Sequence, residues 1–127
     1  MSVHVQWDSE DQTTILWSFV GRWTWGEYED ALGVATAMMD SVDHQIDYIF
    51  DVRHMSILPP DLVTRVKAKY LNQPEKIRYF IAVGFDRDLQ LVWDTFTDLP
   101  YARHLKAEYA DSLEDARDML AGRRAAD

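Results

Sequence analysis

The residues best suited to polar chemistry stand together where one apolar segment of the chain ends. Asp51, Arg53, His54 and Ser56 close or follow the run Ile46–Val52. A carboxylate beside an imidazole can move protons or hold a metal ion, and a guanidinium can bind an anion. The sequence has no His-Glu-x-x-His pair, glycine-rich phosphate loop or nucleophile elbow. An enzyme that uses Asp51, Arg53 and His54 is therefore a weaker hypothesis than a polar, hydrogen-bonded loop.

Two tryptophans flank the start of the first predicted helix. Trp23 and Trp25 stand on either side of Thr24, a good N-cap residue, and Glu27 completes a capping box. The tryptophans could line a pocket for an apolar ligand or anchor a protein partner, because tryptophan brings a large contact area at low entropic cost. Packing beneath the helix is the interpretation we favour, and the binding roles stay open as alternatives.

The remaining pattern supplies the elements that position these side chains. Apolar and β-branched periodicity predicts strands at 3–7, 13–20, 46–52, 77–83 and 104–108. Helices are predicted at 24–42, 59–71, 86–99 and 112–122, with a loop at 53–58. This order predicts an α/β fold, with a small mixed, mainly parallel β-sheet, an N-terminal β-hairpin and four helices. The polar loop then lies at the carboxyl end of the sheet, where ligands commonly bind.

The same periodicity assigns the apolar core. Eight side chains are expected to pack around one sheet: Leu32, Ile49, Phe50, Val66, Ile81, Val83, Val92 and Phe96. They come from two strands and three helices, which predicts a single domain over 1–127.

Composition restricts the classes of function. The chain has 127 residues, no cysteine and a formal net charge of -9, from 22 acidic and 13 basic residues. A chain without cysteine forms no disulfide or thiolate metal site, and the four scattered histidines favour no metal and no cofactor. A strongly acidic protein is repelled by nucleic acid. No apolar stretch approaches a membrane span, and the start of the chain has no signal-peptide pattern, so we expect a cytoplasmic protein.

The order of elements resembles that of the STAS-like (SpoIIAA-like) family, the domain of bacterial anti-sigma-factor antagonists. The features that carry the resemblance are the N-terminal hairpin and helix, the strand ending in Asp51, and the segment 109–116. The paired tryptophans of the segment 21–25 look like those of uncharacterised bacterial stand-alone STAS-like proteins. The resemblance implies a regulatory module that binds a protein partner.

The family's regulatory motif is not preserved here. The resemblance places a phosphorylatable Asp-Ser-Ser/Thr-Gly stretch at the start of the helix after the third strand, which corresponds to about residues 59–62. This chain has Pro59, Pro60, Asp61 and Leu62 there. Asp61 stands near the acceptor position without a hydroxyl, and Ser56 comes too early. The sequence therefore predicts a module that has lost the phosphorylation switch.

Two functions are carried forward from the sequence. The first is a non-enzymatic regulatory or protein-binding module, with Trp23, Trp25, Asp51, Arg53, His54, Ser56 and Asp61 as candidate binding residues. The alternative is a module that binds a small apolar ligand, a lipid or a metabolite, near Trp23 and Trp25. A homodimer is plausible because the hairpin leaves an unpaired strand edge.

Overall fold

The computed structural model describes residues 2–57, 74–84 and 106–126. Two of the four predicted helices, at 59–71 and 86–99, lie outside the described residues. The predicted site residue Asp61 and the predicted core residues Val66, Val92 and Phe96 lie outside them as well.

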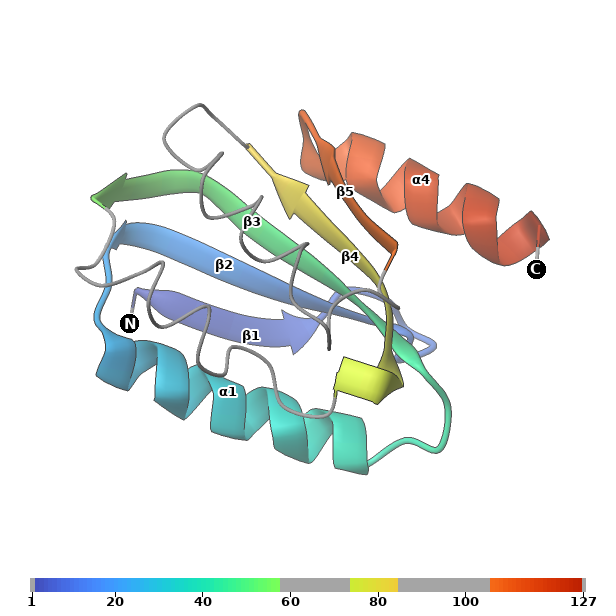
Figure 1. Cartoon of the computed structure of the whole chain (residues 1–127), viewed down its shortest axis with the longest axis horizontal. Coiled ribbons are helices and arrows are strands. Elements are labelled where there is room, and N and C mark those ends of the chain that lie inside the picture. Colours follow the sequence, from blue (N-terminus) through green and yellow to red (C-terminus); the bar gives the residue numbers. More distant parts are fainter. Residues whose placement is uncertain (1, 58–73, 85–105, 127) are drawn as a thin grey trace.

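Over the described residues the chain is an α/β protein with a five-stranded sheet and two helices (Figure 1). The strands are β1 (Val3–Trp7), β2 (Thr14–Arg22), β3 (Ile46–Ile57), β4 (Ile77–Val83) and β5 (Lys106–Ala110). The helices are α1 (Trp25–Asp40) and α4 (Leu113–Ala126), and a short 3₁₀ turn covers Pro74–Lys76. The strands lie side by side in chain order. Among the described strands only the β1–β2 pair is antiparallel, so the sheet is mixed and mostly parallel, as predicted.

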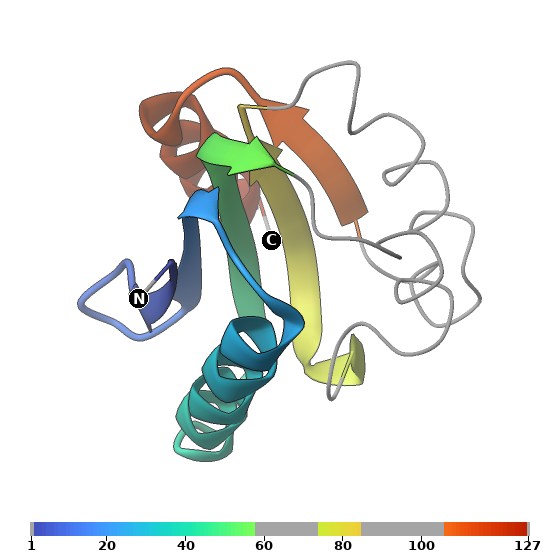
Figure 2. The ribbon, with the colours of Figure 1, turned by 90° about the vertical axis from the view of Figure 1, so that its left-hand side faces the viewer.

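The two faces of the sheet bury different apolar layers, and α1 and α4 lie on opposite sides (Figure 2). On the α1 face an aromatic cluster forms around Trp17, whose ring packs against Tyr28, Tyr48 and Phe50. On the α4 face the layer is aliphatic and includes Leu16, Ile49, Ile81, Val83 and Leu120. Strand side chains alternate between the faces, so neighbouring residues of β2 and β3 serve different layers.

Both ends of α1 are capped. The predicted capping box is present: the Thr24 hydroxyl accepts from the Glu27 backbone N–H, and the Glu27 carboxylate accepts from the Thr24 N–H. Glu27 also accepts a hydrogen bond from the Ser2 backbone N–H at 2.9 Å, which ties the start of the chain to the helix. At the other end, the Lys76 ammonium donates to the carbonyls of Met39 and Val42. A cation at this end also complements the helix dipole.

The structure corrects the predicted end of the last helix. The sequence places the end at Gly122, but α4 continues to Ala126. A glycine inside a helix costs only about 1 kcal/mol, and the residues after it are good helix formers. Arg123 forms an ion pair with Glu108 of β5 and lies over the Tyr79 ring, which holds this turn against the sheet.

Three strands also have bounds that differ from the prediction. The sequence places the second strand at 13–20, but β2 covers Thr14–Arg22. The sequence places a loop at 53–58, but β3 continues through Arg53, His54 and Ser56 to Ile57, because Val20–Arg22 of β2 extend alongside it. The last strand runs over Lys106–Ala110 rather than 104–108. The bounds of β1 and β4 agree with the sequence prediction.

Four of the five described members of the predicted core are buried. Ile49, Phe50, Ile81 and Val83 are at most 4% exposed. Leu32 is only half-buried at the margin of the aromatic cluster. The innermost positions of α1 belong instead to smaller or adjustable side chains, Ala31, Ala35 and Met39, because bulky rings from the sheet fill the space beneath the helix.

Trp17 is the residue on which this cluster depends most. We expect Trp17→Ala to lower the free energy of unfolding by about 3–5 kcal/mol, since the ring is fully buried and its neighbours cannot close the space. The control is Val34→Ala, at an exposed position of α1, which should change stability by less than about 0.5 kcal/mol. Urea denaturation measures both, and equal midpoints for the two variants would contradict the assignment.

Candidate functional site

The end of β3 departs from a regular strand. Ser18 and Val20 of β2 face Asp51 and His54, so β3 holds one more residue than β2 in this interval. A second irregularity follows before Ile57. In a regular strand neighbouring side chains point to opposite faces, and a bulge changes their direction. Here Arg53 folds back onto Asp51, and His54 stands beside Val20. Arg53 and His54 therefore both lie on the α4 face of the sheet.

Asp51 and Arg53 form a closed ion pair. The guanidinium Nε donates to Oδ1 of Asp51 and Nη2 donates to Oδ2, both at 2.9 Å. The Arg53 backbone N–H also donates to Oδ1 at 3.2 Å. The carboxylate is 7% exposed and the arginine side chain 35% exposed. The pair therefore presents its positive member to solvent and keeps its negative member beneath.

The environment of Asp51 contains opposing influences on its ionisation. Burial favours the neutral acid, but the hydrogen bonds from Arg53 and the charges of Arg53 and His54 outweigh that effect. The pKa of Asp51 is therefore held below its usual range, and the carboxylate stays ionised at neutral pH.

Gly84 allows this arrangement. It follows Val83, which faces Asp51 across the sheet, and its φ of +83° lies in the left-handed region that favours glycine. A Cβ at this position would lie 2.2 Å from Cγ and 2.8 Å from Cα of Arg53. Because backbone as well as side chain blocks that space, a rotamer change alone cannot clear it. The Gly84 N–H donates to the Ala110 carbonyl, which fixes the turn against β5.

The structure brings together only part of the predicted site. Asp51 and Arg53 are in contact, and the exposed residues His54 and Ser56 follow them on the same strand. Asp61 lies outside the described residues, so its relation to this group stays a prediction.

The tryptophans belong to a different environment. Trp23 is buried in the aromatic layer, and its indole N–H donates to the Met55 sulfur at 2.8 Å. Trp25 is half-buried and packs edge-on against Trp23 and Tyr28. This is the packing beneath the helix start that the sequence favours.

Sequence patterns miss a second ion pair. Arg117 of α4 binds Asp8 with two hydrogen bonds of 2.8 and 2.9 Å, across 109 residues of sequence. The Asp8 carboxylate is 8% exposed and the arginine side chain 50% exposed. The pair joins the hairpin turn to α4. Neither residue stands in a local motif, so only the three-dimensional contact identifies them.

Asp47 is another carboxylate without a sequence signal. It is fully buried in β3 and accepts a hydrogen bond from the Tyr79 backbone N–H at 3.2 Å. This contact falls where the pairing of β3 with β4 shifts register, between Ile46 and Tyr48. The carboxylate thus has a structural role at an irregular point of the sheet.

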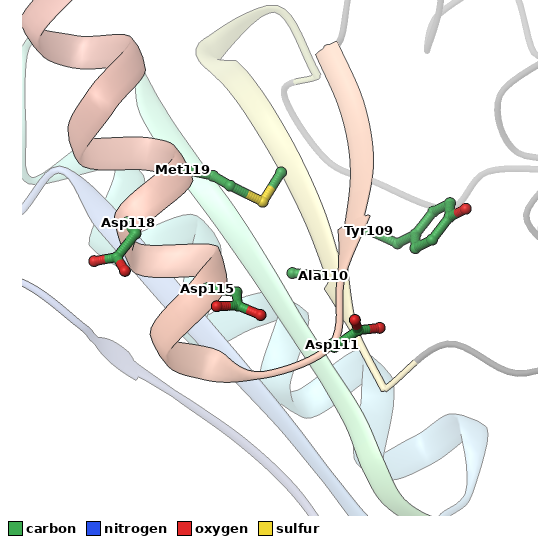
Figure 3. Close-up of a pocket in the computed structure, with 6 residues that line it drawn as sticks. All are labelled: Tyr109, Ala110, Asp111, Asp115, Asp118 and Met119. Atoms are coloured by element: carbon green, nitrogen blue, oxygen red, sulfur yellow. The ribbon is translucent and has the colours of Figure 1, made fainter.

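Two surface hollows of about 380 Å³ lie beside α4. The first is lined by Tyr109, Ala110, Asp111, Asp115, Asp118 and Met119, and Figure 3 shows Tyr109 pointing away from the helix. The second is lined by residues of the hairpin turn together with Arg117, Leu120 and Ala121. Neither is lined by Trp23 or Trp25. Among the described residues, no three His, Cys, Asp or Glu side chains cluster so that they could hold a metal ion.

No protein-family model, curated protein or solved structure matches the chain. The STAS-like resemblance therefore stays a prediction. Within the described ranges, no helix combines the length and apolar character that crossing a membrane requires.

Replacement of Gly84 tests the close approach to Arg53. We expect Gly84→Ala to destabilise the protein by about 1–3 kcal/mol, through the left-handed backbone and the blocked Cβ. The matched control is Gly33→Ala in α1, where no atom lies within 4 Å of a Cβ, and it should stabilise by about 0.5–1 kcal/mol. Thermal denaturation compares them. A shift of the same sign in both variants would show that the approach is unimportant.

The Asp51–Arg53 pair predicts a dependence of stability on pH. Because the pKa of Asp51 is lowered on folding, ionisation of this group stabilises the protein above its unfolded pKa of about 4. That contribution disappears as the pH falls through the lower folded value. Asp51→Asn should therefore be destabilising near pH 7 and much less so at the acidic end, near pH 2. Urea titrations at a series of pH values measure the difference, and a penalty independent of pH would rule out the assigned role.

Proposed function

We propose that the chain is a non-enzymatic STAS-like module that binds a protein partner and lacks the phosphorylatable serine of that family. The observation that carries the proposal is the orientation of Arg53 at the carboxyl edge of the sheet. Its guanidinium uses Nε and Nη2 to hold Asp51, and among the described residues Nη1 has no partner. An arginine fixed in this way offers its remaining N–H groups to a carboxylate or phosphate at little entropic cost.

The state of Asp51 supports recognition over acid/base chemistry. Both of its carboxylate oxygens accept hydrogen bonds from Arg53, and its pKa is lowered. A general base needs a pKa near the working pH and a free oxygen directed at the substrate. His54 stands exposed on the bulged strand beside this pair. Exposed polar groups around one fixed arginine suit a contact surface.

The finer description of the fold belongs to the same proposal. A hairpin, a capped helix and a parallel strand that ends in a polar group are the features on which the STAS-like resemblance rests. The proposal adds helices over 59–71 and 86–99, with Asp61 near the start of the first. With a carboxylate in place of a phosphorylatable hydroxyl, partner binding is constitutive, because about one fixed negative charge replaces a switchable phosphate.

Capture of the partner under matched charge changes tests the proposal. The wild-type chain, Arg53→Glu and Lys106→Glu are used as bait in cell extract, with quantitative mass spectrometry. Arg53→Glu should lower recovery of the specific partner at least about tenfold, which corresponds to about 1.4 kcal/mol. Lys106→Glu, an equal change of charge at the start of β5, should leave recovery unchanged.

A milder variant separates binding from folding. Arg53→Lys keeps the charge above Asp51 but loses the planar fork, so it should fold normally and lose part of the affinity. Circular dichroism checks that each bait is folded. Recovery of the same partner by wild-type, Arg53→Lys and Arg53→Glu baits would refute the proposed function.

A further inference from the structure

The α4 face of the sheet is covered over β3, β4 and β5 but exposed over β1. One in-register row runs across it: His4, Ser18, Asp51, Val83 and Ala110. α4 packs on the half of this row that contains Val83 and Ala110. At the other half His4 is exposed and Ser18 half-buried. We call this half, with Gln6, Val20, Arg53 and His54, the open face.

Two arginines that form the same kind of ion pair lie at opposite ends of the open face. Arg53 stands at the carboxyl edge of β3, and Arg117 reaches from α4 to Asp8 beyond the end of β1. Each is held by two hydrogen bonds to a carboxylate that is at most 8% exposed, and each has Nη1 without a partner among the described residues. The Asp51 carboxylate raises the pKa of Arg53, and the nearby charge of Arg117 opposes that rise.

The open face exposes guanidinium groups over buried carboxylates. Asp51 and Asp8 balance the charges of Arg53 and Arg117, and the exposed Asp11 lines the hollow beside Arg117. The chain carries a net charge of -9. The strand positions of the open face present imidazole, amide, hydroxyl, aliphatic and guanidinium groups, and their one carboxylate, Asp51, lies beneath Arg53. Asp115 and Asp118 of α4 line the hollow beside β5, on the other side of that helix.

We propose that the open face docks an extended acidic segment of the partner protein, with carboxylates on Arg53 and Arg117. The inference rests on the proposed function and adds the chemistry of the partner and the position at which it binds. Arg53 and Arg117 are held near the levels of Ser18 and Thr14, respectively. These two residues are about 13 Å apart along β2, at 3.3 Å per residue. An extended segment spans this interval in about four residues, so alternate acidic side chains on one side of it meet both arginines.

The other groups of the open face fit the same occupant. Val20 is 47% exposed and offers aliphatic contact beside His54, at the carboxyl end of the open face. His4 and Gln6 stand on the edge strand and can donate hydrogen bonds. Because the net charge of the whole protein repels an acidic peptide, any binding that occurs has to come from local donors.

Nuclear magnetic resonance with a defined probe tests the inference. The probe is a short peptide of alternating Glu and Thr, added to ¹⁵N-labelled full-length chain up to about 1 mM. We expect salt-sensitive shifts at His4, Ser18, Val20 and Arg53, with the Arg117 guanidinium signal moving as well. The same peptide with Gln in place of Glu should cause no shifts.

Variants that leave both ion pairs intact keep the test independent of folding. His4→Glu with Gln6→Glu places two negative charges on the open face and should abolish the shifts. The matched control is Val34→Glu with Ala37→Glu, at exposed positions of α1, which should leave the peptide titration unchanged.

The outcomes separate the inference from the proposed function. Chemical-shift changes that are confined to the open face and lost in the variant with His4→Glu and Gln6→Glu support the inference. No shifts, shifts elsewhere, or tighter binding of a phosphorylated peptide or an oligonucleotide would overturn it. If the inference fails while Arg53→Glu still loses its cellular partner, the proposed function stands and the partner binds in another way. If Arg53→Glu retains that partner, the proposed function fails as well.

Discussion

Burial of β3 on both faces is the constraint around which the described structure is organised. From Ile46 to Asp51 every residue of this strand is at most 5% exposed, with an aromatic layer on one side and an aliphatic layer on the other. Such a strand lies in the interior of a sheet, and the remaining strands pair outward from it. Coverage ends at Asp51. The candidate site is therefore the place where the central strand leaves the core and its side chains change from apolar to charged.

Local signals in the sequence predict local structure well. The capping box at Thr24 and Glu27 needs only residues three positions apart, and both hydrogen bonds are present. The run Ile77–Val83 consists of β-branched, aromatic and small apolar residues apart from Arg78, and its bounds are predicted correctly. The mainly parallel pairing of the sheet also follows from the alternation of strands and helices, because parallel neighbours need a crossover.

Features that depend on distant partners are not predicted. The bulges that carry β3 past Asp51 arise from its pairing with β2, and no residue type marks them. The Asp8–Arg117 pair joins the two ends of the chain and leaves no pattern within either segment. Gly84 is visible in the sequence as the end of a strand. Its second role, the space it leaves for the Arg53 backbone, is apparent only in three dimensions.

The division of the apolar layers has a consequence for how unfolding can be observed. The four tryptophans of the described residues, Trp7, Trp17, Trp23 and Trp25, all pack in the aromatic layer beneath α1, whereas the layer beneath α4 contains none of them. With the fifth tryptophan, Trp93, replaced by phenylalanine, their fluorescence follows tertiary order on one side of the sheet. Far-ultraviolet dichroism follows the helices on both sides. If α4 separates before the rest, these signals change at different denaturant concentrations, so the chain carries an internal test of whether its two layers unfold together.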